Sequence, residues 1–189
     1  LQNDEMPAAL RDRQRLWLDQ ALQQAPDDLD VLATAVYYCS VTPPCATSPA
    51  LRQRLADVEP DNAANWAYTI AATDDLPTLR RKLRAAATAP RFDDHFERVW
   101  RLGHEATLSS GVPLPALLQA AARRLNQDQA PESVVSYFHA WAMPLMNWHG
   151  PLEACGPEAP AVRDQTLRAD CLTLGIRAMR ESRALIGQL

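Results

Sequence analysis

Histidine titrates closest to neutral pH and is the side chain that most often binds metals, and this sequence contains four of them. His95 and His104 are nine positions apart, so in one helix they would point to opposite faces and could not share a metal. His139 and His149 lie on either side of Pro144, which should kink a helix. No HExxH motif occurs. We therefore interpret each histidine as a surface or hydrogen-bonded side chain, and we predict no metal and no cofactor.

An enzyme or a small-ligand carrier is the alternative that these histidines leave open. Its pocket would lie between the aromatic residues of two predicted helices, 93–109 and 132–147, and would use His95, His104 or His139. A catalytic histidine also needs a nucleophile beside it, and the GxSxG elbow is absent. The glycines are too widely spaced for a GxGxxG or P-loop motif, which argues against dinucleotide and P-loop NTPase chemistry. We therefore favour a protein that is not an enzyme.

Carboxylates occur in clusters at 27–30, 74–75 and 93–94, a pattern that acid–base catalysis or calcium binding would also require. Each cluster falls at the predicted start of a helix, where an acidic side chain stabilises exposed N–H groups by ~0.3–1 kcal/mol. We therefore interpret the clusters as helix caps. The basic run at 80–84 is expected to be the solvated face of a helix, with the footprint of an acidic partner as the alternative.

The overall charge does not favour nucleic acid as a partner. The formal net charge is -4, so no excess of basic residues is available to release counterions from a phosphate backbone. On the surface of a helix, Arg101 is expected to pair with Glu97 and Glu105, four residues before and after it. The longest uncharged stretches, 31–51 and 133–152, are interrupted by prolines, so neither is expected to cross a membrane.

The four cysteines form two local pairs, Cys39 with Cys45 and Cys155 with Cys171. We predict two disulfides, because the first pair flanks a proline turn after an apolar helix and the second joins a loop to a helix. Disulfides would place the chain in a periplasm or outside the cell, whereas reduced thiols in a cytoplasmic protein are the alternative. The sequence opens at Leu1 rather than Met, which we expect where a signal segment has been removed or the chain shortened; both fit export.

Leucine and alanine dominate the sequence, and apolar positions recur every three or four residues. This pattern predicts an all-α protein of stacked helical hairpins, with about nine helices, in a single domain over 1–189. Residues 7–90 would form the hairpins, and 91–189 an irregular helical bundle with a long loop at 147–162. The predicted helices are 7–25, 28–41, 49–58, 61–73, 76–89, 93–109, 114–127, 132–147 and 163–186.

Two of the prolines that separate these helices, Pro26 and Pro60, are 34 residues apart. Each ends one helix and is followed six positions later by a large apolar residue, Leu32 or Trp66. Over residues 11–73 the chain resembles the tetratricopeptide family, whose unit is a helix pair of this length that ends in proline. The resemblance implies that Trp66 is buried in the core of a hairpin. An irregular helical bundle is the alternative.

The tetratricopeptide family holds an extended peptide or a partner helix in a concave groove, which the first helix of each pair lines. The resemblance implies a groove lined by Asp30, Ala33, Tyr37, Ala64, Ala67, Ala71 and Asp74. Among these, we expect Asp30, Tyr37 and Asp74 to bind a partner. Trp148 and His149, at the start of the 147–162 loop, join them because neither has an evident structural role and such residues often anchor interfaces.

We therefore expect a non-enzymatic protein–protein interaction module of an exported bacterial protein, located in the periplasm or secreted. One form of this hypothesis is an immunity protein that neutralises a secreted toxin, because such proteins are often small, acidic, helical and poor in motifs. The alternative is the small-ligand-binding protein or hydrolase described above. A cytoplasmic location is the alternative if the cysteines are reduced.

Overall fold

The computed structural model describes residues 8–41, 45, 47–71, 73–109, 148–159 and 163–182. Within these residues the chain folds into α-helices and forms no β-strand, which confirms the all-α prediction. The described helices are α1 (Ala8–Gln24), α2 (Leu29–Val41), α3 (Ser48–Val58), α4 (Ala63–Thr69), α5 (Leu76–Thr88), α6 (Phe96–Ser109), α9 (His149–Ala154) and α11 (Gln165–Glu181). The predicted helices at 114–127 and 132–147 lie outside the described residues.

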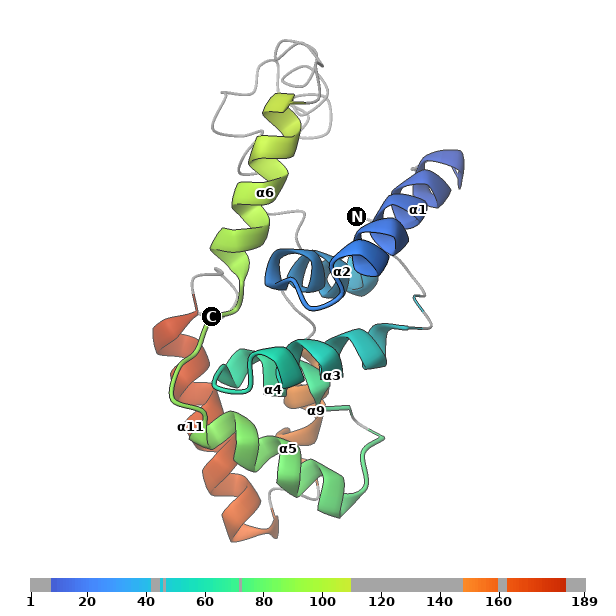
Figure 1. The fold of residues 1–189 in the computed structure, drawn as a ribbon. Helices are drawn as coiled ribbons and strands as arrows, with labels where there is room; N and C mark the ends of the chain where they lie inside the picture. The colour runs from blue at the N-terminus through green and yellow to red at the C-terminus, as the bar shows by residue number, and fades with distance from the viewer. Residues whose placement is uncertain are drawn as a thin grey trace, which may run out of the picture.

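Consecutive helices pack against one another from α1 through α5, as expected for stacked hairpins (Figure 1). Three further contacts link segments that are distant in the sequence: α2 with α6, α4 with α9, and α5 with α11. α4 spans only Ala63–Thr69, so the helix predicted over 61–73 is shorter at both ends than we expected. The tetratricopeptide-like repeat over residues 11–73 stays a prediction.

Polar side chains begin several helices by accepting hydrogen bonds from backbone N–H groups that have no partner within the helix. Before α2, Asp28 Oδ1 accepts two backbone N–H groups at 2.9 and 3.0 Å. Asn62 caps α4, Asp75 caps α5 and Asp164 caps α11 in the same way. These bonds confirm that the acidic clusters before α2 and α5 include helix caps.

The core is formed by apolar side chains from α2, α3, α4, α5 and α11. The largest fully buried ones are Leu32, Leu55, Tyr68, Leu83, Leu167 and Leu174. Trp66, which we expected to be buried, is only partly buried, and its indole Nε1 donates to the carbonyl oxygen of Pro60 at 2.8 Å. Tyr68 shares the inward face of α4 with Ala64, four residues earlier, whereas Trp66 lies about half a turn away. The buried aromatic residue of this helix is therefore Tyr68.

Both predicted disulfides are present. Cys39 is joined to Cys45 and Cys155 to Cys171, with Cα–Cα distances of 5.2 and 5.7 Å, which are ordinary for disulfides. The first closes the chain beyond α2, and the second fastens the end of α9 to α11. Because disulfides persist in oxidising surroundings, this pairing favours an oxidising compartment.

The segment predicted as an irregular loop at 147–162 contains a helix, α9, so the prediction is wrong for this part. α9 packs on α4, and Gly150 permits the close approach, because a Cβ there would overlap the carbonyl oxygen of Ile70. Gly150 and Pro151 are buried in this contact. Glycine and proline, which usually indicate a loop, here belong to a short helix because the neighbouring helix α4 covers them.

Trp148, just before α9, belongs to an aromatic cluster. Its ring stacks on Phe92 with centroids 6.1 Å apart and meets Tyr68 edge-on at 6.4 Å. Both arrangements are favourable for aromatic rings. Our expectation that Trp148 has no structural role is therefore wrong.

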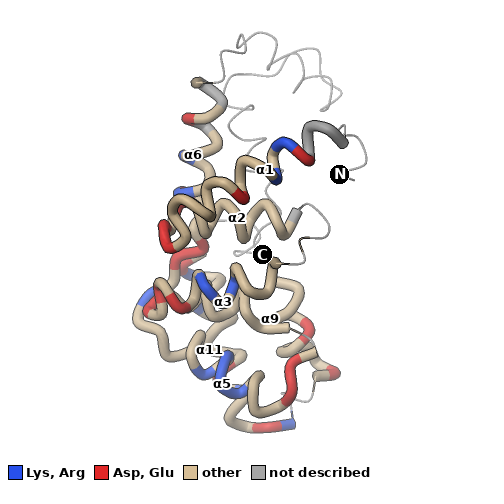
Figure 2. The backbone as a smooth tube through the Cα atoms, turned by 45° about the vertical axis from the view of Figure 1, so that its right-hand side comes forward, with Lys and Arg blue, Asp and Glu red and all other residues tan. Residues whose placement is uncertain are grey.

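The basic run at 80–84 lies in α5 (Figure 2). Several of its side chains form ion pairs within the protein. Arg80 pairs with Asp164, and Arg84 lies 3.3 Å from Asp170. Both carboxylates belong to α11 or its cap, so these pairs join α5 to α11. The side chains of Arg80 and Arg84 remain 54% and 55% exposed, as expected of a solvated helix face, and they also link α5 to α11, which packs along it.

Lys82 is the only lysine in the sequence, and its side chain is only 11% exposed. Its Nζ donates to the carbonyl oxygen of Thr69 at 2.6 Å and to the two carboxylate oxygens of Asp74 at 2.9 and 2.8 Å. Asp74 also accepts the backbone N–H of Ala71 at 2.9 Å. Asp74, which we expected in a binding groove, is therefore held inside the turn between α4 and α5.

Replacing Lys82 by arginine should lower the free energy of unfolding by about 1–2 kcal/mol. An ammonium directs its three N–H bonds from one small centre, whereas a guanidinium is larger and keeps its donors in one plane. Denaturant unfolding measures the change. Arg81→Lys, the reverse substitution at the neighbouring exposed position, is the control and should change stability by less than about 0.5 kcal/mol. Equal stability of Lys82→Arg and wild type would contradict this role of the ammonium.

Candidate functional site

His95 lies just before α6 rather than inside a helix over 93–109, as we expected. Its side chain is fully buried, and its backbone φ is 56°, a conformation that residues other than glycine rarely adopt. Asp93 Oδ1 accepts the N–H of His95 at 2.9 Å, and Asp94 Oδ1 accepts the N–H of Phe96 at 3.2 Å. These bonds hold the turn, and α6 begins after it, three residues later than predicted.

A buried polar cluster surrounds His95. Its Nε2 lies 2.8 Å from Asn65 Oδ1 and 3.3 Å from Glu59 Oε2, so this nitrogen carries the hydrogen. The same carboxylate accepts the Nδ2 groups of Asn62 and Asn65, each at 2.8 Å, and pairs with Arg91. Burial by itself would raise the pKa of Glu59, but hydrogen bonds from His95 and its neighbours outweigh burial and hold the pKa well below its ordinary value.

This cluster positions helices rather than a substrate. Glu59 follows α3 and Asn62 caps α4, while His95 precedes α6, so their bonds fasten the turn between α3 and α4 to the start of α6. Glu59 stays ionised at neutral pH and His95 lies in the interior, so neither is placed to act on a molecule at the surface. The interpretation of His95 as a hydrogen-bonded histidine is confirmed.

The other histidine with a described side chain, His149, does not belong to the buried polar cluster around His95. His149 is exposed on α9, where its Nε2 lies 3.2 Å from Glu153 Oε1. The side chain of His104 and all of His139 lie outside the described part of the chain, as does the helix predicted at 132–147 that would close the alternative pocket. Within the described ranges, no three histidine, cysteine or acidic side chains form a group that could hold a metal.

α6 contacts α2 through an ion pair and a small apolar cluster. Arg98 of α6 pairs with Asp30 in the first turn of α2. Ala33 and Val99 are buried against each other, and Tyr37 packs on them. Burial raises the pKa of Tyr37 to about 12, so its hydroxyl is neutral at physiological pH. Two of the predicted binding residues, Asp30 and Tyr37, therefore lie at the junction of α2 and α6.

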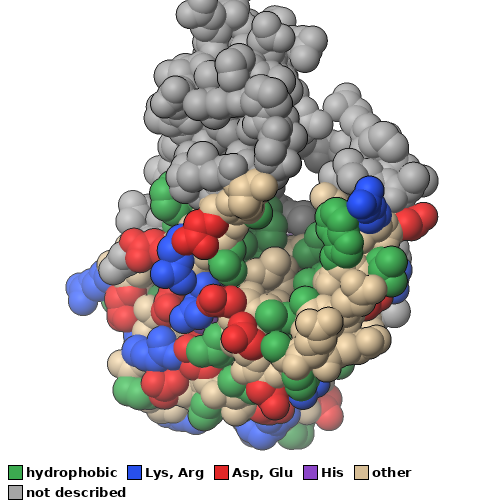
Figure 3. Space-filling model, turned by 45° about the horizontal axis from the view of Figure 1, so that its top comes forward, with side chains coloured by type: hydrophobic (Ala, Val, Ile, Leu, Met, Phe, Trp, Pro, Cys, Tyr) green, Lys and Arg blue, Asp and Glu red, His purple; other side chains and the backbone are tan. Residues whose placement is uncertain are grey.

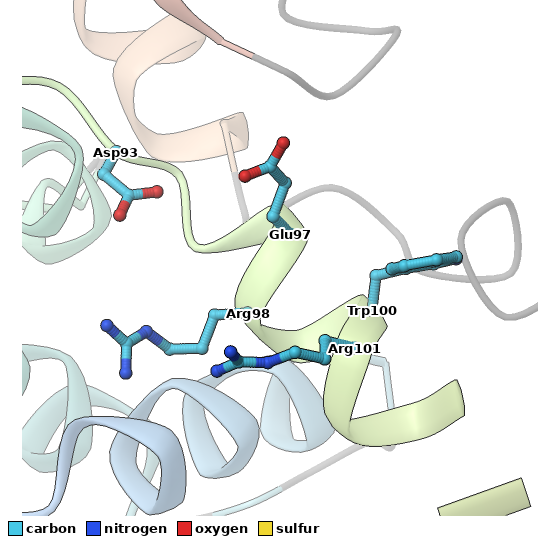
Figure 4. A pocket seen from close by; sticks show the side chains of 5 residues that line it. All are labelled: Asp93, Glu97, Arg98, Trp100 and Arg101. Carbon is cyan, nitrogen blue, oxygen red and sulfur yellow. The ribbon is translucent and has the colours of Figure 1, made fainter. Parts of the chain in front are cut away.

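An open pocket of about 410 Å³ lies beside the first turns of α6, and we call it the α6 pocket. The described residues that line it are Asp93, Glu97, Arg98, Trp100 and Arg101 (Figure 4). Its volume is within the range of pockets that bind small molecules or anchor side chains. Charged side chains of both signs gather along one side of the molecule in Figure 3. The α6 pocket combines such charges with one large aromatic ring.

Arg101 is exposed in the α6 pocket. The ion pairs that we expected with Glu97 and Glu105 do not form, and Arg101 has no ion-pair partner among the described residues. In Figure 4, Arg98 and Arg101 extend to the same side of α6, and Glu97 points away from them. Residues three apart share a helix face, so Arg101 follows Arg98 toward the side on which Asp30 lies. Two guanidinium groups therefore occupy this side of α6.

The other residues predicted to bind a partner, in the groove and at the start of the 147–162 loop, lie away from the junction of α2 and α6. Ala64 and Ala67 are fully buried, because both α5 and α9 pack on the short helix α4. Asp74 pairs with the ammonium group of Lys82, and Trp148 lies in the aromatic cluster beside α9. His149 is exposed, but it lies on α9, not on α2 or α6.

Sequence reasoning expected, as an alternative, a pocket against the helix predicted at 93–109, but it did not identify the residues that line the α6 pocket. Residues 93–109 have the pattern of an ordinary amphipathic helix, and no motif marks Arg98, Trp100 or Arg101. The ion pair that orients Arg98 joins it to Asp30, 68 positions away. Only the packing of α6 on α2 brings Arg98 and Asp30 together, so the spacing of residues within one helix could not have revealed this ion pair.

Comparison with known proteins provides no identity: no protein-family model, curated protein or solved structure matches the chain. None of the helices in the described ranges is both long and apolar enough to cross a bilayer. The α6 pocket and the two disulfides are therefore the features on which a functional proposal rests.

Proposed function

We propose that this chain is a non-enzymatic protein-binding module of an exported protein, and that its partner binds at the α6 pocket and the adjoining part of α2. The observation that carries this proposal is the presence of Trp100, Arg98 and Arg101 in one open pocket. Tryptophan and arginine are among the residue types that contribute most to binding energy at interfaces. Asp30 and Tyr37 lie at the same helix junction, so a partner would contact both helices.

Export is supported by the two disulfides, which persist in a periplasm or outside the cell and are rare in the cytoplasm. A protein is favoured over nucleic acid as the partner because the chain has a net charge of -4. Two carboxylates, Asp93 and Glu97, also line the pocket. A mixed-charge pocket of this kind suits a protein surface, which itself carries both signs of charge.

A secreted toxin is the partner that we propose in particular. The chain would then be an immunity protein, which neutralises the toxin by covering part of its surface. Small size, acidic charge and an all-α fold support this form of the proposal. It does not require the tetratricopeptide-like repeat over residues 11–73, because the pocket lies on α6 and the adjoining part of α2 is defined by its contact with α6.

Photo-crosslinking from the α6 pocket tests the proposal. A photoreactive residue in place of Glu97 should trap a partner protein in the native periplasm or medium. The same residue in place of Arg168, exposed on α11, is the control and should not trap it. The trapped protein is identified by mass spectrometry, purified and mixed with this chain, and we expect a dissociation constant below about 1 μM. If the partner is a toxin, its activity should fall in proportion to complex formed.

Equal trapping from both positions would contradict the assigned face, and so would a trapped protein that does not bind after purification. A small molecule retained by the purified chain, with no protein partner, would favour the small-ligand alternative. A hydrolase would need His104 or His139, since His95 is committed to the buried polar cluster.

A further inference from the structure

We infer that the beginning of α3 binds a small oxyanion, a carboxylate or a phosphate group, through the side chains of Arg52 and Ser48. Arg52 is partly buried, yet among the residues that the structure describes it has no hydrogen-bond acceptor and no ion-pair partner. The site lies on α3 and shares no residue with the α6 pocket. The inference therefore goes beyond the proposed function and does not depend on it.

The guanidinium group of Arg52 is a charge without an internal counterpart. Its Nε is buried and unpaired. Burial lowers the pKa of Arg52 below its ordinary value, and no described carboxylate raises it again. Arg54, two positions later, is exposed and donates to Asp27 at 2.9 Å. A desolvated charge without a partner destabilises a fold, and an anionic ligand would offset this cost at Arg52.

Ser48 is a second unpaired donor on the same face of α3. It is only 9% exposed, and its Oγ is buried without a hydrogen-bond partner. Residues four apart share a helix face, and long side chains in a helix lean toward its N-terminus. The side chain of Arg52 therefore extends over the turn that contains Ser48. Buried hydroxyl groups nearly always have a partner, so this donor is consistent with a bound acceptor.

The N-terminus of α3 adds a further attraction for an anion. Its N-cap, Thr47, makes no side-chain hydrogen bond to the first turn, and that turn contains no acidic residue. The positive end of the helix dipole therefore has no side-chain anion of its own helix beside it, and it favours a negative charge. The same dipole disfavours the cation of Arg52, so α3 itself gives no reason for a positive charge at this position.

The chemistry of these groups selects the ligand. A guanidinium group can donate two parallel N–H···O bonds to a carboxylate or a phosphate, and a hydroxyl group can donate a third. Nε is the one atom of the Arg52 guanidinium that is buried without a partner, so the terminal nitrogens remain open to a ligand. A nucleic acid is disfavoured, because one guanidinium group can neutralise only one of its many phosphates.

Titration calorimetry of the whole chain with inorganic phosphate, and separately with acetate, tests the inference in a low-salt buffer that contains neither ion. At least one of the two should bind with a dissociation constant below about 10 mM, and the ion that binds identifies the group. Arg52→Met should weaken this binding at least about tenfold, and Ser48→Ala about two- to fivefold. Arg54→Met removes the same charge from an exposed position of α3 and should weaken it less than about twofold.

Thermal melting separates a binding role of Arg52 from a structural one. Without a ligand, Arg52→Met should melt at or above the wild-type temperature, because the guanidinium has no described partner to lose. The ion that binds, at about ten times its dissociation constant, should raise the melting temperature of wild type by about 3–6 °C. It should raise that of Arg52→Met by less than about 2 °C.

Three results would overturn the inference. Neither ion binds wild type, or Arg52→Met and Arg54→Met weaken binding equally, so that binding follows net charge alone. The third is a ligand-free melting temperature of Arg52→Met well below that of wild type, since Arg52 would then support the fold.

Discussion

Replacing Glu59 by alanine should lower the free energy of unfolding by about 2–4 kcal/mol, a large share of the stability of an average domain. The substitution removes the buried acceptor of the Asn62 and Asn65 amides and a partner of Arg91. Buried donors that lose their acceptor cost their desolvation free energy. Denaturant unfolding followed by circular dichroism measures the change. Glu158→Ala, at an exposed position, is the control and should change stability by less than about 0.5 kcal/mol.

The contribution of Glu59 should also depend on pH. Its pKa is lower in the folded protein than in the unfolded chain, where it is about 4.3. A carboxyl group with a lowered folded-state pKa contributes stability above its unfolded pKa, and this contribution is lost as the pH falls toward the folded value. The stability difference between wild type and Glu59→Gln should therefore be full at neutral pH and shrink below about pH 4. A difference that stays constant into strong acid would contradict an ionised, hydrogen-bonded carboxylate.

Trp148 is partly buried, and replacing it by alanine should cost about 2–3 kcal/mol of stability and lower the melting temperature by roughly 4–12 °C. Its ring packs on Phe92 and Tyr68, and such aromatic pairs contribute about 0.5–1.5 kcal/mol each beyond the buried area. The loss would also loosen α9, because Trp148 immediately precedes it. Trp17→Ala is the matched control: Trp17 is 53% exposed on α1, so its loss should cost less than about 1 kcal/mol.

Differential scanning calorimetry of the two tryptophan variants checks this contrast. A wild-type melting temperature for Trp148→Ala would make Trp148 a surface residue again and restore it as a candidate for partner binding. If Trp17→Ala were as destabilising as Trp148→Ala, burial would not be the cause of the loss.

Local features of the fold were predictable from the sequence. The helices follow from the spacing of apolar residues, and caps such as Asp28 and Asp75 bond to N–H groups within three residues. Both disulfides join cysteines that are close in sequence, at separations of 6 and 16. α9 was missed because Gly150 and Pro151 have loop character on their own. They become helical where α4 covers them.

Of the residues at the candidate site, those on α2 are the ones that the sequence predicted to bind a partner. Asp30 and Tyr37 do lie beside α6, but Asp74 and Trp148 proved to be held by internal contacts. Aspartate and tryptophan occur both at binding surfaces and in contacts inside a protein. Which of the two applies depends on the residues that pack against the side chain. Arg101, which a local rule paired with glutamates of its own helix, lies in the open pocket without an ion pair to any described residue.

The sequence by itself determined the all-α fold, the starts of several helices and the two disulfides, because each depends on residues that are neighbours along the chain. Only the tertiary structure decided which charges are paired and which are available. Asp30 meets Arg98 across 68 residues and Arg80 meets Asp164 across 84. Such pairs depend on which helices pack together. The burial of many apolar side chains determines this packing, and the spacing of residues within one helix does not. The junction of α2 and α6 at the proposed partner site has the same origin.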